Sequence, residues 1–297
     1  MRGGSPGGRP VPFAVPEHLE VVDSTNRYLL DLARAGLDDG SEVPEGYAVV
    51  AERQSEGRGR LQRRWEAPTG TAVLCSILFR PDLPPEDLHL VPWAVALAAL
   101  EACREVAGVE LAPKWPNDLL AAARGSLPER AASMAGSEGR KVAGVLSEIL
   151  PPRTARDPDG GLQKTRAAMV VGIGINVNWP PGWPPPESKD PDLVSIAEKA
   201  TALNQIAGRE IDRDELVARM LSFARSRHAM LGEEKGQRII ASQYRQACST
   251  IGRVVRVELP DEIIVGRALD IDDSGSLLVE TGACIRTIAA GDLVHLR

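Results

Sequence analysis

The chain of 297 residues carries 35 lysines and arginines against 41 aspartates and glutamates, a net charge of -6. This balance excludes a general electrostatic attraction to nucleic acid or to an anionic membrane, so any basic function is local. With 43% hydrophobic and 26% charged residues, the composition is that of a globular protein, and the length predicts two domains. Apolar runs fall short of the roughly 20 residues needed to span a bilayer.

The N-terminus and the cysteines predict a cytoplasmic protein. The opening sequence MRGGSPGGRPVPF has no apolar core of a secretory signal, and we expect a disordered leader over residues 1–15. The four cysteines are far apart and form no CxxC motif, which argues against a zinc site or a disulfide framework. Each is expected to be a small buried hydrophobic residue in a reducing compartment: Cys75, Cys103, Cys248 and Cys284.

The first half of the chain predicts alternating helices and strands. DSTNRYLLDLARAG, residues 23–36, predicts a helix with a polar cap that ends at Gly36. Residues 46–54 and 71–79 predict strands, the second buried on both faces because nearly every position is apolar. Residues 88–108 predict a long helix, and residues 109–120 a strand stopped by a proline-containing turn.

Two more strands and a second domain follow. Residues 141–150 and 167–179 predict neighbouring strands of one sheet. Three segments rich in proline, glycine and charge match or exceed the ~12–15 residues of ordinary connections and predict hairpin insertions or disorder: 121–140, 151–166 and 179–191. Residues 195–200, 213–231 and 236–248 predict helices. Short strands with Asp/Gly turns after residue 250 predict a small β domain over 250–297, behind a catalytic α/β domain over 16–249.

The stretch QSEGRGRLQRRW, residues 54–65, concentrates positive charge in an acidic chain; we call it the Arg/Gly loop. A solvated hairpin tip, an RNA-binding segment and a loop that folds over a phosphate or carboxylate are the three interpretations. An RNA-binding RG segment normally repeats, and this one does not. The alternation of Gly57 and Gly59 with Arg58 and Arg60 favours the third, because glycine permits close approach and arginine donates charge-assisted hydrogen bonds.

Two further motifs follow predicted strands. KWPND, from Lys114 to Asp118, is either a plain Pro-Asn-Asp turn or a group that contacts a triphosphate and its Mg²⁺. Lys141, which opens KVAGVLSE, is either a solvated charge or points into a pocket opened by Gly144.

The buried strand GIGINVN carries Gly172 and Gly174, which indicates close approach of a ligand or of backbone. The chain contains neither a GxGxxG motif in a βαβ unit nor a GxxxxGK[ST] loop, so a dinucleotide site and a P-loop are excluded.

Together and in this order, DSTN, RQSEGRGRLQRRWEAPTG, KWPNDLL, KVAGVLSE, VVGIGINVN and GDLVHLR resemble the biotin protein ligase family over Val21 to Arg297. The resemblance implies a three-layer, mixed-sheet α/β domain related to class II aminoacyl-tRNA synthetases, followed by a small SH3-like β-barrel. It implies a two-step reaction in which biotin and Mg·ATP give biotinyl-5′-AMP and pyrophosphate. A lysine of a biotin carboxyl carrier protein domain then accepts the biotinyl group.

The resemblance also implies roles for particular residues. The catalytic candidates are Arg58, Lys141 and Asp118, with Asp118 either a Mg²⁺ ligand or the group that orients the acceptor lysine. The biotin-binding candidates are Ser24, Thr25, Asn26, Gln54, Gly57, Arg58, Arg60, Lys141 and Gly144. The nucleotide-binding candidates are Arg58, Gly59, Arg60, Trp65, Lys114, Asn117, Asn176 and Arg297. No tightly bound organic cofactor is implied, because ATP and biotin are both substrates.

The resemblance includes one departure, one expected absence and one open alternative. Glu56 stands where the family often has a small residue, which leaves its effect on loop closure undefined. About twenty residues precede the first motif, too few for a helix-turn-helix, so we expect a monofunctional ligase without sequence-specific DNA binding. The family includes monomers and homodimers. The rival functions are a lipoate- or octanoyl-transferring enzyme of the same fold and a non-enzymatic nucleic-acid-binding module.

Overall fold

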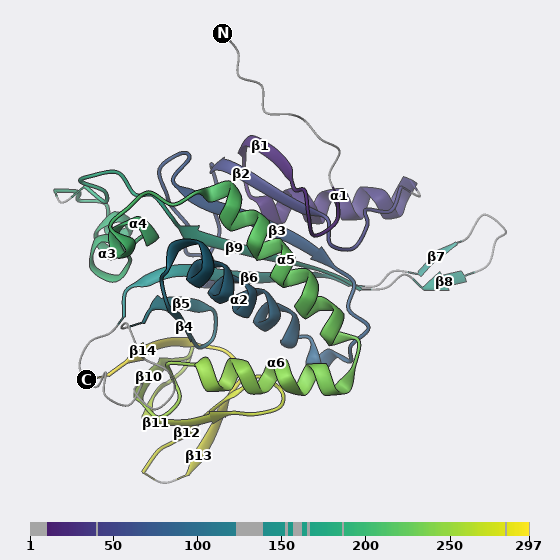
Figure 1. The fold of residues 1–297 in the computed structure, drawn as a ribbon. Helices are drawn as coiled ribbons and strands as arrows, with labels where there is room; N and C mark the ends of the chain where they lie inside the picture. Colours follow the sequence, from purple (N-terminus) through teal and green to yellow (C-terminus); the bar gives the residue numbers. More distant parts are fainter. Residues whose placement is uncertain are drawn as a thin grey trace.

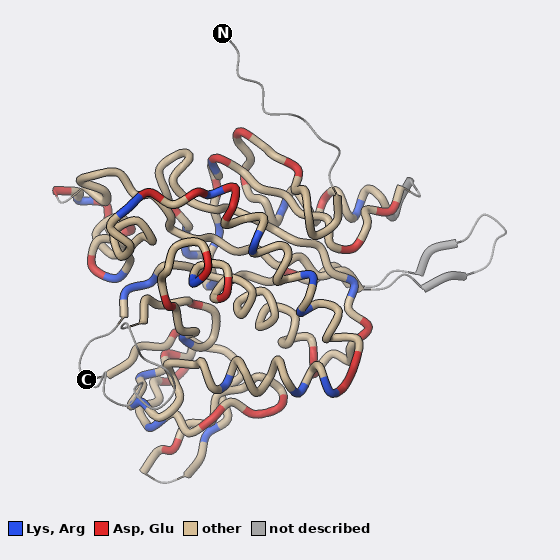
Figure 2. Tube along the Cα trace, in the orientation of Figure 1, with Lys and Arg blue, Asp and Glu red and all other residues tan. Residues whose placement is uncertain are grey.

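The computed structural model describes residues 11–39, 41–122, 139–151, 154–156, 162–164, 167–185, 187–282 and 284–296. In this part of the chain a large α/β domain is followed by a small β domain (Figure 1). Arg297, residues 1–10 of the predicted leader and most of segment 121–140 lie outside the described residues. Basic and acidic residues are interspersed along the described trace (Figure 2).

Seven strands form one mixed sheet in the order β1-β2-β3-β9-β6-β5-β4. The first pair is parallel and the other neighbours are antiparallel. The prediction that residues 141–150 and 167–179 form neighbouring strands is confirmed by the pairing of β6 with β9. The strands are β1 (Glu17–Val22), β2 (Ala48–Gln54), β3 (Ala72–Phe79), β4 (Leu111–Lys114), β5 (Asp118–Ala121), β6 (Lys141–Leu150) and β9 (Ala168–Asn176).

Helices cover both faces of this sheet, which gives three layers (Figure 1). On one face, α1 (Thr25–Asp39) buries a small cluster with alternate strand positions: Leu29, Ala33, Val49, Leu78 and Val170. On the other face, the intervening positions join the main core, among them Val50, Ile77, Val171 and Ile173. The strands are apolar in successive positions because both of their faces are buried.

The main core is built around α2 (Leu90–Ala102), which lies between the sheet and the two helices α5 (Arg213–Leu231) and α6 (Glu234–Ala247). Its Ala/Leu-rich sequence is buried on all sides, as a helix surrounded by protein requires. A π-helical turn, Cys103–Ala107, follows and ends at Gly108, whose φ of 68° is the left-handed conformation that favours glycine. The predicted end of this helix is confirmed.

Smaller elements extend from the α/β domain. In the predicted segment 151–166, β7 (Thr154–Arg156) pairs antiparallel with β8 (Leu162–Lys164), so a hairpin insertion is present. The short helices α3 (Pro191–Lys199) and α4 (Leu203–Ala207) follow the proline-rich segment. None of the described helices has both the length and the apolarity to cross a membrane.

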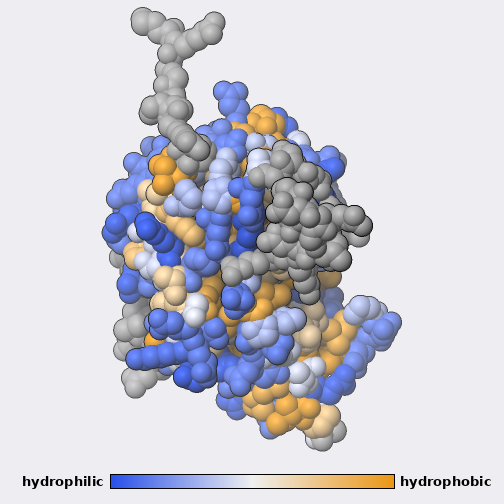
Figure 3. All heavy atoms as spheres, turned by 90° about the vertical axis from the view of Figure 1, so that its right-hand side faces the viewer, coloured by the Kyte–Doolittle hydropathy of each residue, from blue (hydrophilic) through white to orange (hydrophobic). Residues whose placement is uncertain are grey.

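The C-terminal domain is a five-stranded antiparallel sheet in the order β13-β12-β11-β10-β14. Its strands are β10 (Val254–Glu258), β11 (Ile263–Ile271), β12 (Leu277–Glu280), β13 (Ile285–Ile288) and β14 (Asp292–His295). Figure 3 shows an apolar area at the bottom of the viewed face, at the level of this domain in Figure 1. The predicted small β domain is therefore present as a separate sheet.

Two hydrogen bonds join the C-terminal domain to the KWPND turn, and a third joins Ser249, just before the domain, to Pro113, just before the turn. The backbone N–H of Trp115 donates to Thr250 Oγ1 over 3.0 Å, and Trp115 Nε1 donates to the carbonyl of Gly275 over 3.0 Å. The backbone N–H of Ser249 donates to the carbonyl of Pro113 over 2.7 Å. Because Trp115 is only 2% exposed, these contacts fix the turn firmly against the second domain.

Three sequence predictions need correction. Residues 11–15 form a turn in which Phe13 is buried and packs against Phe79 and His228, so the expected leader is ordered at this end. Cys284 is exposed, unlike the other three cysteines. The first helix runs on to Asp39 and does not end at Gly36. The predicted strand that stops at a proline-containing turn is confirmed as β4, and a second strand, β5, follows the Trp115–Asn117 turn.

Candidate active site

The register of the large sheet brings the candidate residues onto one face. Directly paired residues of neighbouring strands point to the same side. Asp118 pairs with Gly144, Gly144 with Gly174, and Gly174 with Leu74, so all four lie in one row. Because two of them are glycines, the middle of the row is a depression in the sheet. Further along the strands, the same face is covered by α1.

A β-bulge turns Lys141 toward this depression. The pairing of β5 with β6 shifts by one residue beside Val142. In a regular strand Lys141 would share the face of Ala143, on the opposite side from Asp118, because the side-chain period is two. The bulge re-aims the lysine, and Lys141 Nζ lies 2.6 Å from Asp118 Oδ1.

The two glycines of the depression are in contact with Trp65. A Cβ atom on Gly174 would lie 2.5 Å from Trp65 Cε2, and one on Gly144 would lie 3.2 Å from Trp65 Cζ3. The ammonium of Lys141 is 5.5 Å from the centroid of the same indole, within cation–π range. Trp65 Nε1 is buried without a hydrogen-bond partner among the described residues. The close approach at Gly174 is made by an indole side chain and not by the ligand or backbone that the sequence predicted.

The N-terminus of α1 forms one wall of the site. Ser24 precedes the helix and accepts its first backbone hydrogen bond, from Tyr28 N–H. Gln54, at the end of β2, accepts hydrogen bonds on its Oε1 from the backbone N–H of Thr25 (2.8 Å) and from Thr25 Oγ1 (3.0 Å). The dipole at a helix N-terminus favours an anion, so this wall suits a negatively charged ligand.

Asn26 is fixed more tightly than its neighbours. Its Oδ1 accepts a hydrogen bond from Ser76 Oγ (2.7 Å), and its Nδ2 donates to the carbonyl of Leu146 (3.1 Å) and to Glu148 Oε2 (2.9 Å). A Cβ atom on Gly172 would lie 2.2 Å from Asn26 Oδ1, so glycine is required there. The predicted close approach at Gly172 is thus made by an asparagine side chain.

The Arg/Gly loop is a small hairpin that covers the depression. Trp65 N–H donates to the carbonyl of Gly57 over 3.0 Å, and Gly59 N–H donates to that of Arg63 over 2.6 Å. A Cβ atom on Gly57 would lie 2.4 Å from the carbonyl oxygen of Trp65, which explains the glycine. At the tip, Leu61 has a φ of 53° and is exposed. Glycine at position 57 therefore allows the two ends of the loop to lie close together.

The arginines of the loop reach three different parts of the molecule. Arg58 Nη1 donates to Glu148 Oε1 of β6 over 3.4 Å. Arg60 Nη1 lies 3.4 Å from Asn117 Oδ1 and 3.5 Å from the carbonyl oxygen of Gly291. Arg63 forms an ion pair with Asp292, also of the C-terminal domain. The loop therefore links the catalytic sheet to the second domain across the depression.

Burial lowers the pKa of Arg60, and this is the largest influence on it, although the nearby carboxylates of Asp118 and Asp292 favour the charged form. Arginine nonetheless stays protonated at neutral pH. A guanidinium that has lost part of its hydration gains more from a bound anion than a solvated one does. Arg60 is therefore well suited to bind a phosphate or carboxylate.

Most of the predicted site residues line one cavity. Those from α1, β2 and the loop are Ser24, Thr25, Asn26, Gln54, Arg58, Gly59, Arg60 and Trp65. Those from the sheet and the KWPND turn are Lys114, Asn117, Asp118, Lys141 and Gly144. Gly57 lies in an adjoining outer recess. Asn176 is buried, and its side chain donates to the carbonyl of Thr201 over 3.2 Å, so the structure does not bring it to this cavity.

Three residues of this region were not singled out from the sequence. Glu148 ends the motif KVAGVLSE, and Asp292 follows glycine in GDLVHLR, so both motifs held a usable signal. Trp115 lies inside KWPND, but a tryptophan in a turn does not reveal that it docks a second domain. Each of these roles depends on contacts between residues far apart in the sequence.

The cavity does not fit a metal ion held by Asp118. The ammonium of Lys141 already lies 2.6 Å from its carboxylate, and a divalent cation there would repel it. The other aspartate of the cavity, Asp292, is paired with Arg63. A protein-held Mg²⁺ needs carboxylate oxygens that no cation occupies, usually one or two together with phosphate oxygens. We therefore assign Asp118 to Lys141 as its ion-pair partner.

Comparison with known proteins gives matches at both ends of the chain. Residues 18–157 match the Biotin/lipoate A/B protein ligase family, and residues 250–296 match the Biotin protein ligase C terminal domain. A protein of Mycobacterium tuberculosis named biotin--[acetyl-CoA-carboxylase] ligase is 32% identical over 92% of this chain and 86% of its own length. The bifunctional ligase/repressor BirA of Bacillus subtilis is 31% identical over 92% of this chain and 72% of its own length.

Solved structures agree with the sequence matches. A mutant biotin protein ligase of Aquifex aeolicus in complex with biotin has a TM-score of 0.67 and 27% identity, covering 96% of this chain and 99% of that one. The Aquifex aeolicus ligase in complex with biotin and ATP has a TM-score of 0.65 and 25% identity, covering 94% and 97%. The chain belongs to the biotin protein ligase family.

Proposed function

We propose that this protein activates biotin with ATP to give biotinyl-5′-AMP and pyrophosphate, and then transfers the biotinyl group to a lysine of a carrier protein. The observation that carries the proposal is the convergence of Arg58, Arg60 and Lys141 on one cavity beside the N-terminus of α1. Membership of the biotin protein ligase family supports the substrate. In the first step a biotin carboxylate oxygen bonds to the α-phosphorus of ATP, the bond between the α-phosphorus and pyrophosphate breaks, and pyrophosphate leaves.

The first step brings a carboxylate toward a polyphosphate, and these two anions repel each other. Arg58 and Arg60 supply charge-assisted hydrogen bonds from the loop, and Lys141 supplies an ammonium from the sheet. Mg²⁺ accompanies ATP as part of the substrate and is bound by the phosphate oxygens. The positive charges lower the repulsion, and the helix N-terminus adds a fixed dipole of the same sign.

The mixed anhydride must then be kept from water. The Arg/Gly loop covers the depression and is attached to both domains, through Glu148 on one side and Asp292 on the other. A closed loop keeps the intermediate away from solvent until the carrier protein arrives. Trp65 rests on the two glycines of the floor and offers an aromatic face for the nucleotide base.

In the second step the acceptor lysine must lose its proton to water, from a reference pKa of roughly 10.4, before its nitrogen attacks the acyl carbon. A second proton leaves this nitrogen for water as the amide forms. Asp118 lies in the cavity beside Lys141, accepts a hydrogen bond from the neutral amine of the acceptor lysine and orients it toward the acyl carbon. The new amide bond forms as the acyl–phosphate bond breaks and AMP leaves. The partner in this step is a biotin carboxyl carrier protein domain of an acyl-CoA carboxylase, and the compartment is the cytoplasm.

A lipoate or octanoyl ligase of the same fold is the second candidate, because the matching family model covers lipoate enzymes as well. The match of residues 250–296 to the biotin ligase C-terminal domain favours biotin. Incubation with ATP, a carrier domain and labelled biotin or labelled lipoate separates the two. We expect label from biotin on the carrier lysine; label from lipoate alone would contradict the proposal.

A further inference from the structure

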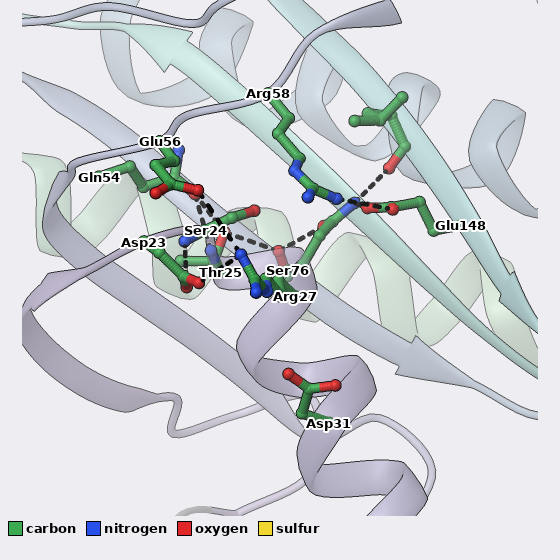
Figure 4. Close-up of polar contacts among 12 residues, drawn as sticks. Asp23, Ser24, Thr25, Arg27, Asp31, Gln54, Glu56, Arg58, Ser76 and Glu148 are labelled. Atoms are coloured by element: carbon green, nitrogen blue, oxygen red, sulfur yellow. Dashed lines mark hydrogen bonds and ion pairs between the residues drawn. The ribbon is translucent and has the colours of Figure 1, made fainter. Parts of the chain in front are cut away.

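Glu148 is the one acidic residue of the motif KVAGVLSE, and the proposed reaction does not use it. It lies on β6 and lines the outer recess beside the loop, where Arg58 also lies. Glu148 Oε1 accepts a hydrogen bond from Arg58 Nη1 over 3.4 Å, and its Oε2 accepts one from Asn26 Nδ2 over 2.9 Å. Figure 4 shows the side chains of Arg58 and Glu148 pointing toward each other.

The carboxylate of Glu148 is held by a rigid partner. Asn26 is 4% exposed, and its amide is fixed from both ends by Ser76 Oγ and the carbonyl of Leu146. There is no room for the amide to shift toward β9, because it lies against the backbone of Gly172. A chain of hydrogen bonds therefore runs from buried Ser76 through Asn26 and Glu148 to the guanidinium of Arg58.

Glu148 holds Arg58 without occupying its binding face. Arg58 lines both the substrate cavity and the outer recess, whereas Glu148 lines the outer recess. The single contact uses Nη1, one of the five N–H donors that a guanidinium offers. The side chain of Arg58 is 45% exposed, and without this contact it would sample many rotamers.

We propose that Glu148 is a positioning residue for Arg58, resting on the proposed function of Arg58 in binding the acyl-adenylate. Glu148 restricts the guanidinium to the rim of the cavity before the anion binds, so less rotamer freedom is lost on binding. The opposite role is a competing anion that draws Arg58 away from the substrate. The two roles have opposite effects on ligand affinity. A competing anion weakens the binding of the adenylate, whereas a positioning residue slows its release.

Glu148→Gln separates the two contacts of this carboxylate. Glu148 accepts the two hydrogen bonds on different oxygens, and glutamine keeps only one of these positions as an acceptor. The fixed Asn26 amide, itself a donor, takes that oxygen. The glutamine NH2 group then faces Arg58, donor against donor, and the tether is lost with little change in shape. Glu66→Gln is the matched control, because Glu66 pairs with Arg64 of the same loop over 3.7 Å and the charge change is identical.

The experiment measures release of labelled biotinyl-AMP from preloaded full-length enzyme into excess unlabelled ligand, with thermal unfolding checked in parallel. We expect release about two- to five-fold faster in Glu148→Gln, the range for a partly exposed ion pair, and unchanged in Glu66→Gln. In an Arg58→Ala background, Glu148→Gln should have no further effect, because its action passes through Arg58.

Three results would overturn the positioning role. If Glu148→Gln changes the release rate equally with and without Arg58, Glu148 is merely structural. If Glu148→Gln slows release, Glu148 competes with the ligand for Arg58. If wild-type enzyme forms no biotinyl-AMP, the proposed function itself is wrong. If wild type forms it and Glu148→Gln releases it at the wild-type rate, only the role of Glu148 is wrong.

Discussion

Lys141 Nζ lies 2.6 Å from Asp118 Oδ1, although the two residues come from different strands and the lysine would face away in a regular ladder. A bulge beside Val142 makes this contact possible. The side chains are 32% and 25% exposed, so both remain accessible to a ligand in the cavity. The carboxylate keeps the ammonium in place, and the ammonium occupies the position that a metal ion would need.

Lys141→Ala should reduce biotin-dependent ATP–pyrophosphate exchange by about 10²-fold or more, because loss of a preorganised charge at a reacting anion costs this much. Folding should change little, since the side chain lies at the rim of the site. Lys235→Ala, which removes an exposed lysine of α6, is the control and should be neutral. A wild-type exchange rate in Lys141→Ala would remove this residue from the active site.

Arg58→Ala should weaken biotin binding and let biotinyl-AMP escape. A hydrogen bond to a charged group contributes about 1.5–3 kcal/mol, which corresponds to a release rate roughly 10- to 100-fold higher. The measurement is the appearance of free biotinyl-AMP in a reaction without carrier protein, compared with Arg225→Ala on the exposed side of α5. Retention as tight as in wild type would contradict the loop-closure account.

Gly174→Ala should displace Trp65, because the new Cβ would lie 2.5 Å from the indole. Overpacking of this kind costs about 1–3 kcal/mol of stability, and here it also disturbs the floor of the site. Tryptophan fluorescence and the exchange rate should therefore both change.

Gly282→Ala is the matched control for this variant. A Cβ at Gly282 would meet nothing within 4 Å, and its φ is not in the left-handed range. If Gly174→Ala left both the fluorescence and the exchange rate as unchanged as Gly282→Ala does, the contact between Trp65 and the sheet floor would be wrong.

The hydrophobic pattern predicted strands β2, β3, β6 and β9 and helices α1, α2, α5 and α6 of the sheet domain, but it missed β1, β5 and α4. Residues 71–79 and 167–179 are apolar on successive positions because they are buried on both faces, and the pattern reports this directly. The pattern could not show the bulge at Val142, since a bulge changes the pairing of two strands and leaves the sequence periodicity intact. The face to which Lys141 points was therefore an open question until the structure was known.

The candidate residues were predicted through motifs, but their partners were not. Gly172 and Gly174 indicated close approach, and the structure shows that Asn26 and Trp65 are the approaching groups. The side-chain amide of Asn176 donates a hydrogen bond to the carbonyl of Thr201 in the protein interior. Pairings such as these join residues tens of positions apart, and a single sequence carries no signal for them.

The stability of the joint between the domains should depend on pH through His295. Burial lowers the pKa of His295 to about 3, and Lys114 and Arg253 lower it further. The ring is therefore neutral in the folded protein, and its Nε2 lies 3.0 Å from Thr250 Oγ1. In the unfolded chain the same group titrates near its ordinary value of 6.5.

The free energy of unfolding depends on pH because the folded and unfolded states bind different numbers of protons at His295. Between pH 6.5 and about 3 the unfolded state binds more protons, so the free energy of unfolding falls as the pH falls. The contribution of His295 is fully present above pH 6.5 and decreases by up to about 1.4 kcal/mol per pH unit below it. Urea unfolding at pH 7 and pH 5 should show this loss, about 2 kcal/mol, in wild type and not in His295→Gln. An equal loss in both proteins would show that His295 is not the group responsible.

The most direct test of the central claim is ATP–pyrophosphate exchange by the full chain with biotin, lipoate or no acid present. Exchange reports the reversible formation of an acyl-adenylate and needs no carrier protein. The account predicts exchange that depends on biotin, is lost in Lys141→Ala and is not supported by lipoate. Exchange with lipoate and none with biotin, or exchange that needs neither acid, would contradict it.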